Sequence, residues 1–283
     1  MTVDVEDYFH VSAFTDVIDR AHWDSFQYRA EANTGRFLEL FAEFGIKATF
    51  FVLGWVAKRS PKLVREIQAA GHEVACHGMS HELVYRQTLQ QFEAETREAK
   101  GLLEDITGTA VHGYRAASWS VTRASLWALD VIEAAGFKYD SSVFPVRHDR
   151  YGIPGASACP GLIMTPLGRQ IVEFPPSTIS ILGARLPVAG GGYFRLLPYS
   201  VTRWALARLN QRLSQPFIFY LHPWEIDTEQ PRIKASRLSQ FRHYTNIGKT
   251  EQRLRELLKE FRCTTAIEVL RDLKLLEPIS AAA

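Results

Sequence analysis

Three carboxylates lie close together at the start of the chain, in the segment TVDVED (residues 2–7). If this segment is a β-strand, its side chains alternate between two faces, so Asp4 and Glu6 point to the same side. Asp7 then points the other way or begins a turn, where it would act as a helix cap or a solvated residue. Because like charges in a dry pocket repel one another, either water solvates these acids or a positive group binds them.

Two histidines at a spacing of four lie in the segment HGMSH, as His77 and His81. On a helical turn this spacing places both imidazoles on one face, where they can share a metal ion. The spacing alone is a weak motif, because roughly 0.3 such pairs are expected by chance among nine histidines. The adjacent Cys76 ends an apolar, strand-like run, so we interpret it as a small core residue. The histidine pair is therefore a candidate metal site that needs support from other residues.

Three more polar residues each end a strand-like segment, namely Arg115, Asp140 and His222. In parallel α/β barrels the carboxyl ends of the strands meet at one edge, where several loops build a shared pocket. A single acid or arginine in such a place is more often a turn residue or half of a surface ion pair. The conjunction of an acid pair, a histidine pair and these three residues at successive strand ends favours one composite site.

The elements that must position these residues repeat a pattern of short apolar runs and amphipathic segments. Strand-like runs begin near residues 2, 48, 72, 111, 137, 170 and 216. Periodicity and punctuation predict helices over 34–44, 60–70, 88–105, 122–135, 199–213 and 250–261, the first two with Thr34 and Ser60 as N-caps. Alternating strands and helices are typical of parallel βαβ units, and about seven strands favour a barrel over an open sheet.

Residues 144–198 depart from this alternation. They hold eight of the thirteen prolines and the turn cluster AGGGYF. We interpret them as loops and hairpins laid over the core, because aromatic and aliphatic residues persist among them. The predicted organisation is a single α/β domain over residues 1–283, with a barrel core of about 1–143 and 214–275 and this loop-rich insertion between the two parts.

Composition excludes several classes of protein. The chain has 283 residues, 46% of them hydrophobic, which suffices for a sizeable core. A net charge of +2 without a basic block argues against nucleic acid as a partner. Three scattered cysteines suggest no disulfide framework. Without a long apolar run or a signal-peptide pattern, we expect no integral membrane segment and a cytoplasmic location.

A series of motifs resembles a known family. The segments TVDVED, ATFFVLG, HEVACHGMSH, GYRAASWS, YDSS and FYLHP match, in order, the motifs of the NodB-homology polysaccharide deacetylases, which are carbohydrate esterases. The segments SSVFPVRHDRYGIP, EFPPST, AGGGYFR, HPWEID and FRHYTNIGKTEQRL resemble the branch associated with exosortase and exopolysaccharide systems. This resemblance implies a distorted (β/α)7-type barrel with an irregular loop region and a C-terminal helical extension. It also implies one divalent metal, usually Zn²⁺, and hydrolysis of N-acetyl groups on hexosamines of a glycan.

The resemblance assigns roles to the acid and histidine pairs. Asp4 matches the general base, and His77 and His81 match the two metal-binding histidines. The family has adjacent aspartates where this chain has Asp-Val-Glu-Asp. Strand geometry favours Glu6 as the metal ligand, and Asp7 is the alternative if a bulge intervenes.

The remaining roles concern proton transfer and sugar binding. Arg115 resembles the arginine that orients the base, His222 resembles the catalytic histidine that protonates the leaving amine, and Asp140 resembles the aspartate that supports it. Four aromatic residues are candidates for stacking on sugar rings: Tyr8, Trp119, Tyr193 and Trp224.

Three hypotheses for function remain open. The first is a metal-dependent polysaccharide N-deacetylase acting on an N-acetylated glycan, by analogy an exopolysaccharide. The second keeps the metal site but hydrolyses a ureide or another small cyclic amide. The third is a non-catalytic glycan-binding module. The sequence does not determine the oligomeric state.

Overall fold

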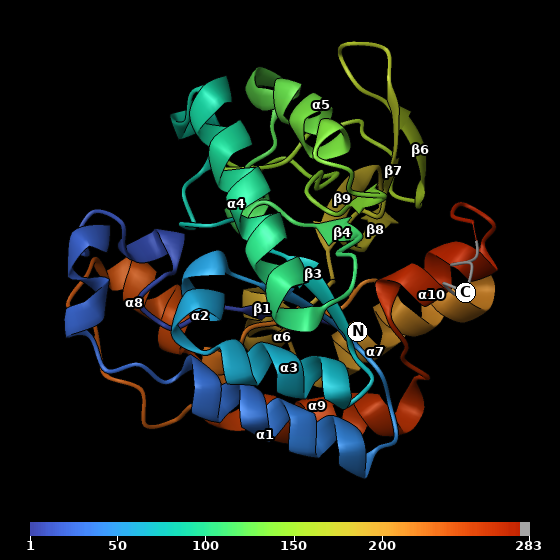
Figure 1. Cartoon of the computed structure of the whole chain (residues 1–283). Helices are drawn as coiled ribbons and strands as arrows, with labels where there is room; N and C mark the ends of the chain where they lie inside the picture. The colour runs from blue at the N-terminus through green and yellow to red at the C-terminus, as the bar shows by residue number, and fades with distance from the viewer. Residues whose placement is uncertain (278–283) are drawn as a thin grey trace.

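An eight-stranded sheet organises the chain, and Figure 1 shows helices packed around it. The structure is a computed structural model that describes residues 1–277. The strand order is β10–β1–β2–β3–β4–β5–β7–β6, and all neighbours are parallel except β6 and β7. The strands are β1 (Thr2–Val5), β2 (Thr49–Val52), β3 (Glu73–Cys76), β4 (Gly113–Tyr114), β5 (Tyr139–Asp140), β6 (Gly161–Met164), β7 (Gln170–Glu173) and β10 (Tyr220–Leu221). The seven strands expected from the sequence are confirmed, and β6 is an additional edge strand.

The sheet forms an open, distorted barrel, because β10 and β6 end it instead of pairing with each other. Beside β10, Gly190 makes an isolated parallel bridge to Tyr220. A Cβ atom at Gly190 would lie 2.1 Å from the carbonyl oxygen of Tyr220, and the backbone there has a φ of +124°. Glycine is therefore required at this position for the chain to run against the free edge of β10.

The pleat of the sheet separates helix-facing from interior side chains. Val3 and Val5 of β1 belong to the apolar cluster that β1 shares with the surrounding helices. Asp4, between them, lies in register with Phe51 of β2, which is in turn in register with Ala75 of β3. Phe51 and Ala75 belong to a separate cluster on the opposite face. Asp4 is thus directed to the barrel interior, as the period of two predicts.

The α-helices pack around the sheet (Figure 1); within residues 1–277, seven lie between its strands in the sequence and three follow β10. They are α1 (Ala30–Glu43), α2 (Gly54–Arg59), α3 (Pro61–Ala69), α4 (Leu89–Thr107), α5 (Trp127–Ala134), α6 (Gly191–Leu196), α7 (Tyr199–Ala207), α8 (Arg237–Tyr244), α9 (Ile247–Glu260) and α10 (Ala266–Asp272). Each of the six helices expected from the sequence has a counterpart. Figure 1 shows α9 running beside α1, where Arg36 of α1 pairs with Glu251 of α9 at 2.8 Å.

Local sequence signals placed some helix starts correctly and others wrongly. Helix α4 begins after Thr88, whose hydroxyl and backbone form a capping box with Gln91. Helix α1 begins at Ala30, so the prediction of Thr34 as its N-cap is wrong. The hydroxyl of Thr34 instead donates to the carbonyl of Ala30 at 2.6 Å, inside the first turn.

The segment predicted as a loop-rich insertion, residues 144–198, contributes to the sheet as well as covering it. It supplies β6 and β7, which extend the sheet beyond β5. It also contains a two-stranded hairpin of β8 (Thr178–Ile181) and β9 (Ala184–Pro187), followed by α6. The predicted domain range of 1–283 includes residues 278–283, which lie outside the described part of the chain.

Candidate active site and metal centre

Three predicted metal ligands converge at the carboxyl ends of β1 and β3. One ligand atom each from Glu6, His77 and His81 lie within 4.8 Å of one another, and all three residues are buried. Oε2 of Glu6 is 2.6 Å from Nε2 of His81, yet it receives no hydrogen bond from residues 1–277. A buried carboxylate oxygen beside two imidazoles, without a hydrogen bond of its own, has the environment expected of a metal ligand. One carboxylate with two histidines is also the donor set of several catalytic zinc sites.

The loop after β3 brings the two histidines together. Residues 77–83 contain no helical turn, and His81 has a φ of 53° while Gly78 has a φ of 76°. The expectation that HGMSH forms a helical turn is therefore wrong. Backbone N–H groups at the start of α2 hold the loop, because Gly54 donates to the carbonyl of Gly78 at 2.8 Å. A left-handed conformation at a non-glycine residue is costly and is often found at functional sites.

His77 is oriented by a backbone contact. Its Nδ1 lies 2.8 Å from the carbonyl oxygen of Arg115. A carbonyl only accepts, so Nδ1 carries the proton and Nε2 is left with a free lone pair. Burial lowers the pKa of His77 to about 4, which keeps the ring neutral at physiological pH.

Asp7 points away from this cluster and caps a helix. Its carboxylate accepts backbone N–H groups from Tyr8 at 2.9 Å, Arg29 at 2.6 Å and Ala30 at 2.7 Å. The last two are the first residues of α1, so Asp7 serves this helix from a distant part of the chain. Burial raises the pKa of Asp7 to about 6 against the opposing effect of these N–H groups. The carboxylate that faces the histidines is that of Glu6.

Glu6 itself is held in its charged form by its surroundings. Burial alone would raise the pKa of Glu6, but the imidazoles of His81 and His222 outweigh it and hold the pKa below its ordinary value. The second oxygen of Glu6 accepts the indole N–H of Trp224 at 3.3 Å and lies 3.6 Å from Nε2 of His222. Oε2 of Glu6 therefore faces the histidines of the candidate metal site, and Oε1 of Glu6 faces His222.

Asp4 forms a buried ion pair with Arg115. The guanidinium nitrogen NH1 of Arg115 is 2.5 Å from Oδ1 of Asp4 and 3.0 Å from the hydroxyl of Thr2. Its other terminal nitrogen donates to Ser141 at 3.0 Å, and the guanidinium lies over the ring of Phe51 at 4.0 Å. With these contacts Arg115 fixes one oxygen of Asp4 and offsets the cost of burying its charge.

Asp140 does not support His222, which corrects the expectation from the sequence. Its carboxylate accepts the hydroxyl of Ser142 at 2.6 Å and lies next to Glu173 at the end of β7. Burial and the Asp140 charge raise the pKa of Glu173 well above its usual range, and burial also raises that of Asp140. Two neighbouring carboxylates repel each other when both are charged, which favours the protonated form of Glu173.

Glu225 is the carboxylate that contacts His222. Its Oε1 is 2.7 Å from Nδ1 of His222 and accepts the backbone N–H of the same residue at 3.1 Å. Burial would lower the pKa of His222, but Glu6 and Glu225 outweigh it and raise the pKa to about 9. The negative charges of Glu6 and Glu225 favour the imidazolium form of His222, which can donate a proton. The spacing in HPWE could have revealed this pair, since a glutamate three residues after an N-cap position is the pattern of a capping box.

A cavity of about 410 Å³ lies in front of these groups. Its lining includes Asp4, His222 and the three candidate metal ligands Glu6, His77 and His81. Three of the four aromatic candidates also line it, namely Trp119, Tyr193 and Trp224. The fourth, Tyr8, is 1% exposed and packs into an apolar cluster with Phe9, so its prediction as a sugar-binding residue is wrong. Glu6, Asp7 and Tyr8 follow the end of β1 at Val5, so the period of two of a strand does not set their directions.

These groups together match the requirements of hydrolysis at an amide or ester carbonyl. Such a reaction needs a base for water, a positive centre for the carbonyl oxygen and an acid for the leaving group. Asp4 is a carboxylate fixed by Arg115, the Glu6 cluster has the donors for a cation, and His222, paired with Glu225, can supply a proton. All line the same cavity.

No helix within residues 1–277 combines the length and the apolar character needed to cross a lipid bilayer.

Comparison with known proteins relates both halves of the chain to protein families. Residues 19–139 match the family model of polysaccharide deacetylase, and residues 141–271 match a domain of unknown function, DUF3473. His77, His81 and Arg115 lie in the first range, and His222 with Glu225 lies in the second. Asp4 and Glu6 precede both ranges.

Individual relatives cover only part of the chain. A peptidoglycan deacetylase from Helicobacter pylori is 33% identical over 116 residues, or 41% of this chain and 39% of that protein. A chitooligosaccharide deacetylase from Rhizobium leguminosarum is 38% identical over 99 residues, or 35% of this chain and 43% of that protein. The chain thus spans about two fifths of the length of these curated relatives.

A solved structure covers the whole fold. The crystal structure of a "putative polysaccharide deacetylase" from Mycobacterium smegmatis has a TM-score of 0.65 and 19% sequence identity, covering 100% of this chain and 92% of that one. At this identity the match supports a shared fold, which agrees with the predicted distorted barrel.

Proposed function

We propose that this chain, which belongs to the polysaccharide deacetylase family, is a metal-dependent hydrolase that removes N-acetyl groups from N-acetylhexosamine residues of a glycan. The observation that carries the proposal is the convergence of a fixed carboxylate, a two-histidine carboxylate cluster and an imidazolium on one cavity. The products are acetate and a free amine on the sugar. By resemblance of the segments in 141–271, we propose an exopolysaccharide as the glycan.

Glu6, His77 and His81 would hold the metal, and the donor set fits zinc. When bound, a divalent metal polarises a carbonyl and lowers the pKa of water toward about 7. The chain's own part here is to fix these three side chains. His77 is oriented through its Nδ1 by the carbonyl of Arg115, and Glu6 is directed by the turn after β1.

Asp4 is the proposed base that removes a proton from the attacking water. Its Oδ1 is occupied by Arg115, so the other oxygen is the one available to accept a proton. Arg115 is 0% exposed and is fixed by Thr2 and Ser141 as well as Asp4. The arginine therefore sets the direction of the carboxylate without touching the cavity, whose lining does not include it.

His222 is the proposed acid that protonates the leaving amine. An amine leaves poorly from an amide carbon unless its nitrogen gains a proton as the bond breaks. Glu225 occupies Nδ1 of His222, so the proton that faces the cavity is the one on Nε2. After donating it the ring is neutral, and the Nδ1–H bond to Glu225 keeps its orientation.

The aromatic residues of the cavity suit a sugar ring. Trp119, Tyr193 and Trp224 present π faces or edges at the lining, where they can pack against the C–H face of a hexosamine. The indole Nε1 of Trp119 is buried and has no hydrogen-bond partner within residues 1–277. We propose that this N–H donates to a substrate oxygen, because leaving a buried donor unpaired is costly.

Acetate release from N-acetylglucosamine oligomers by the purified, zinc-loaded protein tests the proposal directly. We expect Asp4→Asn and His222→Asn each to lower kcat by roughly 10²- to 10⁴-fold, as loss of a general base or acid does. Asp105→Asn is the matched control, because Asp105 is exposed on α4 and is not part of the cavity lining. It should retain full activity.

Other outcomes separate the competing functions. Turnover of a small ureide with no acetate release would favour the cyclic-amide hydrolase. Tight glycan binding without turnover by the metal-loaded protein would favour a binding module. Acetate release that survives Asp4→Asn would contradict the assignment of the base.

A further inference from the structure

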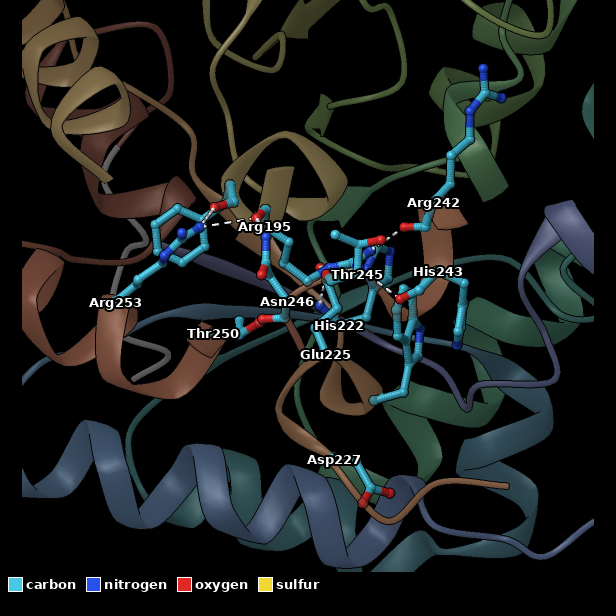
Figure 2. Close-up of polar contacts among 12 residues, drawn as sticks. Arg195, His222, Glu225, Asp227, Arg242, His243, Thr245, Asn246, Thr250 and Arg253 are labelled. Atoms are coloured by element: carbon cyan, nitrogen blue, oxygen red, sulfur yellow. Dashed lines mark hydrogen bonds and ion pairs between the residues drawn. The ribbon is translucent and has the colours of Figure 1, made fainter. Parts of the chain in front are cut away.

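We propose that Arg195 is a positioning residue for His222 and acts on it through Glu225. This inference rests on the proposed function, in which His222 is the acid. Arg195 is in α6 and is 2% exposed, and Glu225 is 0% exposed. The three side chains form a hydrogen-bonded row with the Glu225 carboxylate in the middle, and Figure 2 labels all three residues.

Both oxygens of Glu225 are used in this row. Oε2 accepts Nε–H of Arg195 at 2.7 Å, while Oε1 accepts Nδ1–H of His222 at 2.7 Å. The two oxygens of a carboxylate are at a fixed distance from each other. Holding Oε2 against the guanidinium therefore restricts where Oε1 can lie. The direction of the Nδ1–H bond, and with it the place of Nε2 in the cavity, therefore depends on where Arg195 is held.

Helix α8 holds the other side of Arg195. Its terminal nitrogens donate to the backbone carbonyls of His243 at 2.6 Å, Thr245 at 3.1 Å and Arg242 at 2.9 Å. These carbonyls are at the C-terminal end of α8, where helical carbonyls lack partners within the helix and attract positive charge. Together with the bond to Glu225, the Arg195 guanidinium makes four hydrogen bonds, which hold its plane in one orientation (Figure 2).

The ring of His222 is fixed from a second direction by stacking. Its ring lies 5.0 Å from that of Trp224 at an angle of 14°, and Trp224 lies 4.1 Å from the ring of His243 at 16°. Arg195 also stands 5.4 Å from the Trp224 ring. The arginine thus contacts both supports of His222, namely the carboxylate at Nδ1 and the stacked rings that set the plane.

Helix α6 is itself tied to α9 by a different arginine. Arg253 of α9 donates through NH1 to the backbone carbonyls of Phe194 at 2.6 Å, Arg195 at 3.0 Å and Leu197 at 3.0 Å. Arg253 makes no contact with Glu225 or His222 among its hydrogen bonds. It therefore offers a matched control, because it caps the C-terminal end of α6 through backbone carbonyls and makes no hydrogen bond to the side chain of Arg195, Glu225 or His222.

The test compares Arg195→Lys, Arg195→Met and Glu225→Gln with Arg253→Met in the metal-loaded full chain. We expect the Arg195 and Glu225 variants to lower kcat by roughly 10- to 100-fold with KM within about twofold, as loss of a buried supporting partner does. Arg253→Met should lower the resistance to urea but leave kcat unchanged. Arg195→Lys keeps the charge but not the planar fork, so it should recover only part of the loss.

A second readout does not depend on activity. In ¹⁵N-histidine NMR spectra, the Nδ1–H signal of His222 should be present in the unmodified protein and in Arg253→Met. It should shift or be lost to exchange in Arg195→Met and Glu225→Gln. If Arg195→Met behaves like Arg253→Met in both kcat and this signal, Arg195 is only a helix cap and the inference is wrong.

The two levels of the proposal can fail separately. If the unmodified, metal-loaded protein releases no acetate, the proposed function fails, whereas the NMR comparison still reports whether Arg195 positions His222. If Arg195→Met does not fold, Arg195→Lys and Glu225→Gln decide the question, because both keep the volume of the buried site close to the original.

Discussion

Replacing Asp7 and Glu6 in turn separates a helix cap from a metal ligand. Asp7 accepts three backbone N–H groups, two of them at the start of α1. Hydrogen bonds to a charged acceptor contribute about 1.5–3 kcal/mol each, and a lost N-cap costs about 0.5–2 kcal/mol. Burial of the Asp7 charge, which raises its pKa to about 6, offsets part of this gain.

From these terms we expect Asp7→Ala to lower the free energy of unfolding by about 3–5 kcal/mol, because it leaves three N–H groups without an acceptor. Asp7→Asn keeps one oxygen, which can serve Arg29 and Ala30, and turns an amide group toward the N–H of Tyr8. It should cost about 1–2 kcal/mol. Urea unfolding followed by tryptophan fluorescence measures both values.

Zinc affinity, measured by competition with a chromophoric chelator, completes the comparison. Asp7→Asn should bind zinc as the unmodified protein does. Glu6→Gln should lose more than the roughly 10- to 100-fold that removal of an outer partner costs, because it removes a direct ligand. Zinc binding that is retained in Glu6→Gln and lost in Asp7→Asn would refute the assignment of the carboxylate.

Three further predictions follow from the structure. Chelation should lower the melting temperature, and added zinc should restore it. At free zinc about 100 times its Kd, the free energy of unfolding should rise by about 2.7 kcal/mol. Glu6→Gln should show little response in the same thermal scans. Burial lowers the pKa of His72 to about 4, and its Nδ1 accepts the N–H of Ala48 at 3.1 Å, so the folded state resists protonation. The contribution of His72 to stability is therefore full above about pH 6.5 and is lost as the pH falls toward 4. His72→Asn keeps an acceptor but cannot titrate, so stability measured by urea unfolding should fall less steeply between these values, and an unchanged slope would contradict the prediction. Gly190→Ala should destabilise the protein by about 3 kcal/mol or more, since its Cβ would lie 2.1 Å from the Tyr220 carbonyl oxygen in a left-handed backbone; a loss below about 1 kcal/mol would show that the chain can move away from β10.

Strand positions were readable from the sequence because they depend on local patterns. The seven parallel strands appear where apolar runs predicted them, and Asp4 faces the barrel interior as the period of two requires. Helix α4 follows its capping box at Thr88 for the same reason. In these cases each residue's own neighbours in sequence decide the outcome.

Functional contacts that join distant segments were not readable in this way. The N-terminus of α1 is capped by Asp7, 23 residues before Ala30, so the local signal at Thr34 misled. The partner of His222 is Glu225 rather than Asp140, because the turn after β10 bends back while Asp140 meets Glu173 across the sheet. Of these contacts only the His222–Glu225 pair has a local sequence signal, the capping-box spacing in HPWE, whereas the contacts of Asp7 and Asp140 join segments far apart in the sequence.

The sequence by itself therefore determined which residue types lie at the strand ends, and with them the class of chemistry. Only the tertiary structure decided which of the three acids in TVDVED faces the histidines. Glu6 does so because Asp7 is drawn to the free N–H groups of α1, whose position depends on packing against the rest of the fold. The same packing placed Arg195, the last residue of the segment AGGGYFR, behind Glu225. Side-chain direction beyond the end of a strand is set by such non-local hydrogen bonds, and a sequence pattern records only the local ones.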